Sequence, residues 1–158
     1  MECSEPFIKG NTELVVVTLH GYSFLYNQIR KMVGMVLAII NGVLSEADFD
    51  VAFDTNKFYN VPLAPASGLL LSMLYYNKYN KRHAAMNDTL SFRDYKDEIN
   101  DFKNKLMDDY VNNEKYKQEM ELWLLQLKEH DTKVRNLTEQ EIEKLMTAKP
   151  KLEQVDHK

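Results

Sequence analysis

One arginine on an otherwise apolar predicted helix is the residue of this sequence best suited to chemistry. Arg30 shares a helical face with Tyr26, Gly34 and Leu37. A guanidinium on such a face cannot lie fully in water, and a buried charge without a partner costs several kcal/mol. We therefore expect Arg30 to contact an anion. From the residues alone, a structural salt bridge is the more common explanation, and a functional carboxylate is the alternative.

The helix that carries Arg30 is predicted to begin after Ser23, a suitable N-cap, and to end at Asn41-Gly42, where glycine can take the left-handed conformation. Between them, apolar residues recur at helical spacing: Leu25, Ile29, Met32, Val33, Val36 and Ile40. From Met32 to Ile40 the sequence is apolar nearly all round, apart from Gly34. This half of the helix is therefore expected to be buried on every side.

Two strands are predicted around that helix. Residues 13–20 form the first, and because Leu14 to Val17 is continuously apolar we expect burial on both faces. Residues 69–76 form the second, after a proline-punctuated loop over residues 60–68. Ser45 to Asp48 has capping-box spacing and predicts a short helix whose inner side carries Phe49, Ala52 and Phe53.

Amphipathic helices dominate the second half of the chain. The first has apolar residues spaced by three and four, and Asn112-Asn113 ends it: Phe92, Tyr95, Ile99, Phe102, Leu106 and Tyr110. The next places inward Tyr116, Met120, Trp123, Leu124 and Leu127. Thr138 to Glu141 again has capping-box spacing, before a short helix with Ile142, Leu145 and Met146 inward. Residues 150–158 are expected to be a loose tail.

These elements predict an α+β fold: a partial mixed or antiparallel sheet with helices packed on one face, followed by an α-helical C-terminal extension. Two doubly buried strands cannot form a stable sheet alone, so we expect further strands from sequence absent here or from another chain. The expected divisions are residues 1–82 for the sheet-containing part, 83–130 for the helical extension, and 131–158 for a short helix and tail.

Composition excludes several classes of protein. The formal net charge is -4, so any nucleic-acid surface must be a local patch. A single cysteine, Cys3, excludes an internal disulfide framework and indicates a reducing, intracellular compartment. The longest apolar run is too short to span a membrane, and no signal peptide is evident. His20 has no second ligand at metal spacing, so neither a metal nor a cofactor is expected.

Two segments together resemble a known family. Ser23-Phe-Leu-Tyr-Asn-Gln-Ile-Arg-Lys-Met-Val-Gly34, followed by Val61-Pro-Leu-Ala-Pro-Ala-Ser-Gly-Leu-Leu-Leu71, resembles the third motif region of the TruA family of tRNA pseudouridine synthases. Tyr76-Asn-Lys-Tyr-Asn-Lys-Arg82 and the later helices are closer to its eukaryotic branch. The resemblance covers residues 13–82 strongly and 91–128 weakly.

The resemblance implies the C-terminal half of a catalytic domain with a helical extension. The family isomerises uridine in tRNA, and its catalytic aspartate sits in an Arg-Thr-Asp-Gly-like motif that this chain lacks. In that view the anionic partner of Arg30 is this absent aspartate. A guanidinium favours the ionised carboxylate and orients it in a planar, bidentate pair. The implied partners are therefore tRNA and the missing N-terminal half of the catalytic domain.

Further site residues follow from the same resemblance. Leu69 matches an apolar residue beside the uracil, Gly68 would let the backbone approach the substrate, and Gln28 is a weaker hydrogen-bonding candidate. Lys31 is expected to be either a solvated lysine or a phosphate contact. The basic and aromatic segment at residues 75–83 is expected either to contact RNA or to be a solvated strand end, and its candidate RNA-binding residues are Lys78, Lys81 and Arg82.

A non-catalytic reading stays open beside the enzyme. Without a nucleophile constellation, the chain could be a helical module that binds RNA or protein through its amphipathic helices. Under either hypothesis the chain alone is expected to be inactive, and the nucleus and the mitochondrion are both compatible locations. An unpaired sheet edge could also join a second copy of the chain.

Overall fold

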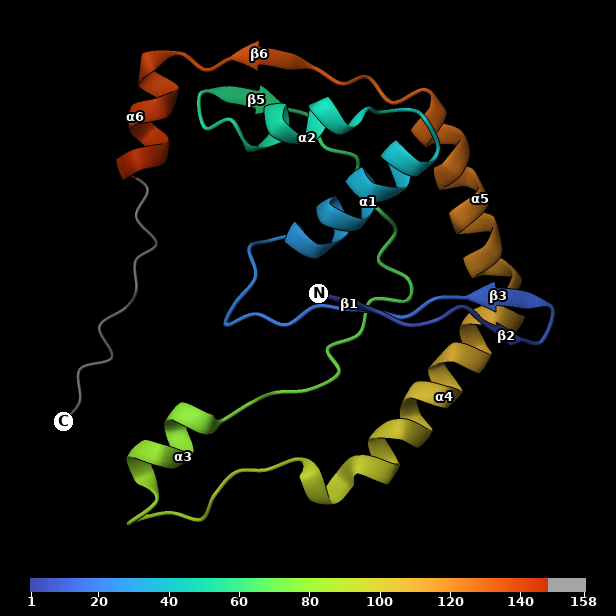
Figure 1. The fold of residues 1–158 in the computed structure, drawn as a ribbon, viewed down its shortest axis with the longest axis vertical. Helices are drawn as coiled ribbons and strands as arrows, with labels where there is room; N and C mark the ends of the chain where they lie inside the picture. Colours follow the sequence, from blue (N-terminus) through green and yellow to red (C-terminus); the bar gives the residue numbers. More distant parts are fainter. Residues whose placement is uncertain (148–158) are drawn as a thin grey trace. The chain divides into compact units, whose positions relative to one another are not determined.

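A computed structural model of the chain describes residues 1–147 and shows an α+β fold, as predicted (Figure 1). In chain order the elements are β1 Glu2–Cys3, β2 Phe7–Lys9, β3 Thr12–Leu14, β4 Val17–Thr18, α1 Gln28–Ile40, α2 Glu46–Phe53, β5 Lys57–Tyr59, α3 Asn77–His83, the 3₁₀ turn η1 Arg93–Tyr95, α4 Lys96–Asn112, α5 Glu114–Lys128, β6 Val134–Asn136 and α6 Glu139–Thr147. The predicted tail at residues 150–158 and the side chains of Leu145 and Met146 lie outside what is described.

Two compact units divide the chain. The first unit comprises Met1–Tyr26 and Pro65–Leu125, and the second comprises Asn27–Ala64 and Gln126–Lys158. The expected boundaries near residues 82 and 130 stay predictions. No helix within residues 1–147 is long and apolar enough to cross a membrane.

The strands form three separate two-stranded antiparallel sheets rather than one sheet. In the first unit β1 pairs with β4, and β2 pairs with β3 in a hairpin with Phe7 opposite Leu14. Gly10 at the hairpin turn has a φ of 59°, a left-handed conformation that suits glycine. In the second unit β5 pairs with β6.

The predicted strand over residues 13–20 is interrupted, and its expected burial is wrong for this chain. Only Thr12–Leu14 and Val17–Thr18 are strand, and Val15, Val16 and Val17 are each more than 40% exposed. A doubly buried strand needs layers on both faces and neighbours on both edges. Within residues 1–147 this run pairs only with the short segments β1 and β2.

The second predicted strand, over residues 69–76, is also absent. These residues form neither strand nor helix, and Leu69, Leu71, Leu74 and Tyr75 are exposed. A strand exists only through hydrogen bonds to a partner strand, and none is present among the described residues. The proline-punctuated segment before it is a loop, as predicted.

Helix α1 begins later than predicted. Asn27, not Ser23, is its N-cap residue and has a left-handed φ of 59°. Its C-terminal end matches the prediction, with Asn41 as C-cap and Gly42 at a φ of 70°. Burial on every side is wrong: Gly34, Met35 and Ala38 are buried, whereas the exposed side chains on this helix include Met32, Val36 and Ile40.

The local signals for α2, α5 and α6 are confirmed. Ser45 and Asp48 form the predicted capping box of α2, and the Asn112-Asn113 break separates α4 from α5. Thr138 and Glu141 exchange hydrogen bonds at the start of α6. Phe49 and Phe53 were expected on the inner side of α2, but both are exposed and contact each other with ring centroids 5.0 Å apart.

The core of the second unit lies between α1, α2 and the segments that follow them. Its buried apolar side chains are Met35, Ala38, Leu44, Tyr59, Ala64 and Leu127. Strand β5 contacts α2 and pairs with β6, so that residues far apart in sequence lie side by side in this unit (Figure 1). The β5–β6 pair was not predicted. It joins the Arg30-bearing part of the chain to the C-terminal segment.

Candidate functional site

Arg30 lies in the first turn of α1 and is half-buried. Its Nε donates a 2.7 Å hydrogen bond to the carbonyl oxygen of Ala64, and its Nη1 donates to Oδ1 of Asn27 at 3.3 Å. Both acceptors are neutral. Within residues 1–147 Arg30 forms no ion pair, so the described part of the chain holds the guanidinium in place without neutralising it.

Close backbone packing produces this arrangement. Gly34, one turn beyond Arg30, lies directly against the loop at residues 62–64, and a Cβ at position 34 would lie 3.1 Å from the Ala64 nitrogen. The Ala64 N–H donates to the Arg30 carbonyl at 3.2 Å. Main chain and side chain of Arg30 thus both bond Ala64, and only a glycine at position 34 allows the loop so near.

Gln28 and Lys31 flank Arg30 on the same turn. Gln28 is half-buried and is the first residue of α1. Lys31 is exposed, and its backbone N–H bonds the Asn27 carbonyl at 2.9 Å. The Lys31 side chain has no ion pair within the described residues, so it remains available to a phosphate. These placements leave both roles as predictions.

Gly68 and Leu69 lie together in one tight turn of the first unit. The Leu69 N–H donates to the Ala66 carbonyl at 3.0 Å, and Gly68 has a φ of 83°, the conformation that a type II turn requires at its third residue. Leu69 is 51% exposed. A Cβ at Gly68 would lie 3.4 Å from the ring of Tyr110, whose pKa is raised, chiefly by burial.

The three other candidate RNA contacts share one short helix. Lys78, Lys81 and Arg82 are all exposed on α3. Residues 77–83 were predicted as basic and aromatic but not as a helix. Lys78 Nζ lies 4.8 Å from the centre of the Tyr22 ring, a cation–π contact. Tyr22 was not predicted as a site residue, and no local sequence signal joins it to Lys78.

The predicted site residues therefore belong to two different units of the chain. Arg30, Gln28 and Lys31 belong to the second unit, whereas Gly68, Leu69 and α3 belong to the first unit. A common pocket for Arg30 and Leu69 stays a prediction.

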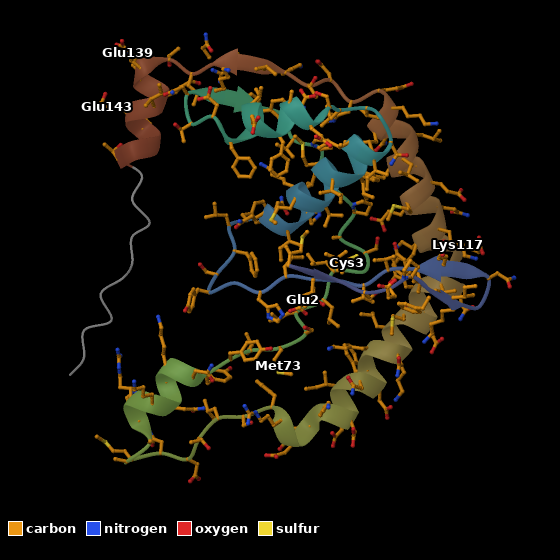
Figure 2. The ribbon with its side chains drawn as sticks, viewed as in Figure 1. Glu2, Cys3, Met73, Lys117, Glu139 and Glu143 are labelled. Atoms are coloured by element: carbon orange, nitrogen blue, oxygen red, sulfur yellow. The ribbon has the colours of Figure 1, made fainter. Side chains whose placement is uncertain are left out.

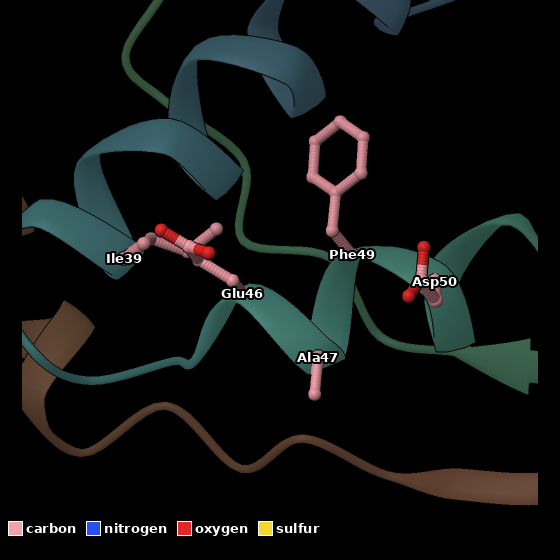
Figure 3. Close-up of a pocket in the computed structure, with 5 residues that line it drawn as sticks. All are labelled: Ile39, Glu46, Ala47, Phe49 and Asp50. Atoms are coloured by element: carbon pink, nitrogen blue, oxygen red, sulfur yellow. The ribbon is translucent and has the colours of Figure 1, made fainter.

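Hollows are also present on the surface of residues 1–147. One, of about 430 Å³, is lined by Ile39, Glu46, Ala47, Phe49 and Asp50, and Figure 3 shows them along α2 and the end of α1. It presents two carboxylates and no cation. Within residues 1–147 no group of three or more His, Cys, Asp or Glu side chains could hold a metal ion. Cys3 is an exposed free thiol on β1, where Figure 2 labels it.

Comparison with known proteins decides the family. The sequence profile described as tRNA pseudouridine synthase matches residues 4–77. The human pseudouridylate synthase 1 homolog is 33% identical over 141 residues, which is 87% of this chain and 33% of the human protein. The chain belongs to the tRNA pseudouridine synthase family. A tRNA pseudouridine synthase 1 from Yarrowia lipolytica is 35% identical over 114 residues, 70% of this chain and 21% of that protein.

A further relative matches a shorter part of the chain. A tRNA pseudouridine synthase 2 from Schizosaccharomyces pombe is 41% identical over 78 residues, 49% of this chain and 17% of that protein. The chain spans about a third or less of the length of these relatives.

Sequence reasoning found Arg30 but missed the groups that hold it. Neither the Asn27 side chain nor the Ala64 carbonyl was predicted as an acceptor, and a backbone oxygen such as that of Ala64 carries no signature in the sequence. The available signal was Gly34: a glycine inside a helix often marks a close approach of another backbone. The proline-punctuated loop at residues 60–68 was the other half of that signal.

Proposed function

We propose that the protein to which this chain belongs is a tRNA pseudouridine synthase that isomerises uridine to pseudouridine in tRNA. The observation that carries the proposal is the guanidinium of Arg30, half-buried and bonded only to neutral acceptors among the described residues. Membership of the family supplies the reaction class. The reaction breaks the glycosidic bond of uridine and rejoins the base through C5, so the target nucleotide must leave its stack.

Arg30 would act on a carboxylate supplied from outside this chain. The two hydrogen bonds to Ala64 and Asn27 use the Nε and Nη1 of Arg30, and a guanidinium has five N–H donors in a planar fork. The remaining donors can therefore meet a carboxylate. A positive charge a few ångströms away lowers a carboxyl pKa by about 1–3 units, which keeps that carboxylate ionised inside a dry pocket. Arg30 is thus a candidate active-site residue.

The other site residues would hold the substrate. Leu69 offers an exposed apolar side chain for a face of the uracil, and Gly68 has the backbone freedom to bring the turn close to it. Gln28 would donate or accept a hydrogen bond near the base. Lys31 would neutralise a phosphate of the RNA backbone.

The missing partner of this chain would be the N-terminal half of the catalytic domain. The first unit leaves apolar strand and loop residues in water, among them Ile8 at 77% and Leu71 at 73% exposure. Exposed apolar side chains and unpaired strand edges favour association with another segment. Strands from the absent half would cover them. In their absence, the same edges would pair two copies of the chain.

The test uses the whole protein and tRNA. In Arg30→Ala, the rate of pseudouridine formation should fall by about 100-fold or more, because removing a preorganised polar group from an active site typically costs this much. The affinity for tRNA should change less than about threefold. Pseudouridine is counted by mass spectrometry of digested tRNA, and affinity by filter binding. Arg93→Ala is the matched control, because Arg93 is an exposed arginine of η1. Equal turnover of Arg30→Ala and the wild type would refute the role of Arg30.

The isolated chain provides a second test. We expect no pseudouridine from residues 1–158 alone, and restored activity when the N-terminal half is added in trans. Binding of tRNA by the chain without any activity in the completed protein would favour the non-catalytic binding module instead. We further propose a nuclear or mitochondrial location, which fractionation of cells expressing the whole tagged protein would examine.

A further inference from the structure

Helix α3 and two neighbouring tyrosines form a surface that the proposed pocket does not use. We define this α3 surface by Tyr22, Tyr75, Lys78, Tyr79, Lys81 and Arg82. All six side chains are exposed and all belong to the first unit. In Figure 1, α3 lies between two connecting segments that are neither helix nor strand. The surface thus joins two parts of the chain that lie more than fifty residues apart in sequence.

Positive charge is concentrated here although the chain is acidic overall. The sequence contains no Asp or Glu between Asp54 and Asp88, a long interval in a chain with 24 acidic residues. Lys78, Lys81 and Arg82 form no salt bridge with any described residue. Their charges are therefore not neutralised by the part of the chain that the structure describes. The local field is positive, and it favours an anionic partner.

Exposed aromatic side chains lie among these cations. Tyr22 is 97% exposed and Tyr75 is 67% exposed. Lys78 lies over the Tyr22 ring, and the Tyr79 ring contacts that of His83 at 4.7 Å. Rings beside cations are the combination that binds unpaired nucleotides by stacking and charge.

The backbone around α3 is held, which makes the surface a defined one. Asn80 bonds Leu90 twice: its Nδ2 donates to the Leu90 carbonyl at 2.8 Å, and its Oδ1 accepts from the Leu90 N–H at 2.9 Å. Asn80 faces the loop that follows α3, so Lys78, Lys81 and Arg82 lie on other faces of the helix. The 3.6-residue period of the helix explains this separation of polar roles.

We infer that the α3 surface binds an unpaired stretch of the RNA substrate, with Tyr22 and Tyr75 stacking on splayed bases and Lys78, Lys81 and Arg82 contacting phosphates. This rests on the proposed function for the identity of the RNA. An unpaired stretch fits better than a duplex, because bases in a helix are already stacked and offer no free face. A seven-residue helix is about 10 Å long, so it contacts only two or three phosphates.

Two kinds of variant, both made in the whole protein, distinguish stacking on the tyrosines from simple charge attraction. Lys81→Ala/Arg82→Ala removes two cations, so the slope of log affinity against log salt for a single-stranded 12-nucleotide oligouridylate should become less steep by about 1.4. Tyr22→Ala should weaken binding of the same oligonucleotide by about 5- to 100-fold at one salt concentration, with no change in slope. Binding of a 12-base-pair RNA duplex should be unaffected by Tyr22→Ala.

Matched controls use exposed residues of neighbouring elements. Lys96→Ala/Lys105→Ala removes two exposed α4 lysines, and Tyr95→Ala removes an exposed tyrosine of η1. Both should leave oligouridylate affinity and slope at wild-type values. Circular dichroism of each variant checks folding.

Several outcomes would overturn the inference. The first is unchanged oligouridylate binding in both variants of the α3 surface. The second is an equal loss of duplex and single-strand affinity in Tyr22→Ala. The third is a change in the control variants as large as that in the α3 surface variants. If every variant still forms pseudouridine but oligouridylate binding changes as expected, the inference stands. Normal pseudouridine formation together with unaltered RNA binding in the α3 variants would remove the inference alone.

Discussion

Gly34 of α1 lies directly against the backbone of Pro62. A Cβ at position 34 would come within 2.8 Å of the Pro62 carbonyl carbon, closer than real Cβ atoms approach. The loop that Pro62 begins also carries the Ala64 carbonyl that accepts the Nε of Arg30. A residue without a side chain therefore decides whether the candidate active-site arginine is held.

Gly34→Ala should destabilise the second unit and release Arg30. Alanine gains about 1 kcal/mol in a helix interior, but overpacking against a buried backbone costs about 1–3 kcal/mol, and a rigid carbonyl group lies at the high end. We expect a net loss near 1–2 kcal/mol in urea unfolding and a fall in turnover of the whole protein. Gly42→Ala is the control, because its Cβ would meet nothing within 4 Å and only its φ of 70° is unfavourable. Wild-type stability in Gly34→Ala would contradict the close approach.

Arg30→Lys separates the charge of Arg30 from its shape. Lysine keeps a positive charge but lacks the planar fork, and it loses the Nε bond to Ala64. We expect a turnover drop of about 10-fold or more with an unchanged acid limb of the pH–rate profile. In Arg30→Ala the limb should move upward by about 1–3 pH units, because the partner carboxyl loses the charge that lowers its pKa. Identical profiles for the lysine and alanine variants would argue against electrostatic tuning.

Tyr59→Phe should weaken the contact between α2 and β5. Tyr59 is buried, and its hydroxyl donates to Oδ1 of Asp48 at 3.1 Å. Burial, followed by the Asp48 hydrogen bond, raises the pKa of Tyr59 to about 12, so the neutral donor form is held across the physiological range. Losing one such bond costs about 0.5–1.5 kcal/mol, measurable by urea unfolding. Tyr75→Phe, at an exposed tyrosine, should change the stability by less than half of that.

The start of α6 should depend on pH through Glu141. Its pKa is lowered to about 2 from 4.5, first by hydrogen bonds from Arg135 and then by those from Thr138. A carboxyl with a lowered folded-state pKa stabilises the fold above pH 4.5, and the stabilisation is lost as the pH falls toward 2. The protection factors of the α6 amides against hydrogen exchange should therefore fall over that window. In Arg135→Ala the NMR-measured pKa of Glu141 should return toward 4.5, and a pKa still near 2 would contradict this account.

Local signals in the sequence predicted the helices well. Ser45 with Asp48 and Thr138 with Glu141 are three residues apart, so their capping bonds need no information from the rest of the chain. The predicted start of α1 at Ser23 was wrong, because the helix begins after Asn27, which has a left-handed backbone. Asn27 forms no side-chain cap hydrogen bond, so the capping preference used for Ser23 does not describe this start.

Non-local pairings could not be predicted. β5 and β6 are three residues each, too short for an alternating pattern, and Val134–Asn136 carries no strand signal. The apolar run at residues 69–76 has strong strand composition yet forms no strand, because composition cannot supply a partner. For the site, the sequence identified Arg30, whereas nothing in it distinguished the Ala64 carbonyl, which accepts from Arg30 Nε, from any other backbone carbonyl.

The pairing of β5 with β6 also determines when the second unit, which contains Arg30, can finish folding during synthesis. Lys57 lies opposite Asn136, and the whole of residues 65–125 emerges from the ribosome between them. His130 and Asp131 add further hydrogen bonds to Asn60 across the same interval. During synthesis residues 27–64 must therefore wait several seconds for β6, at elongation rates of about 5–20 residues per second. A premature stop codon just before residue 134 would allow residues 65–125 to be synthesised, but the second unit would lack strand β6.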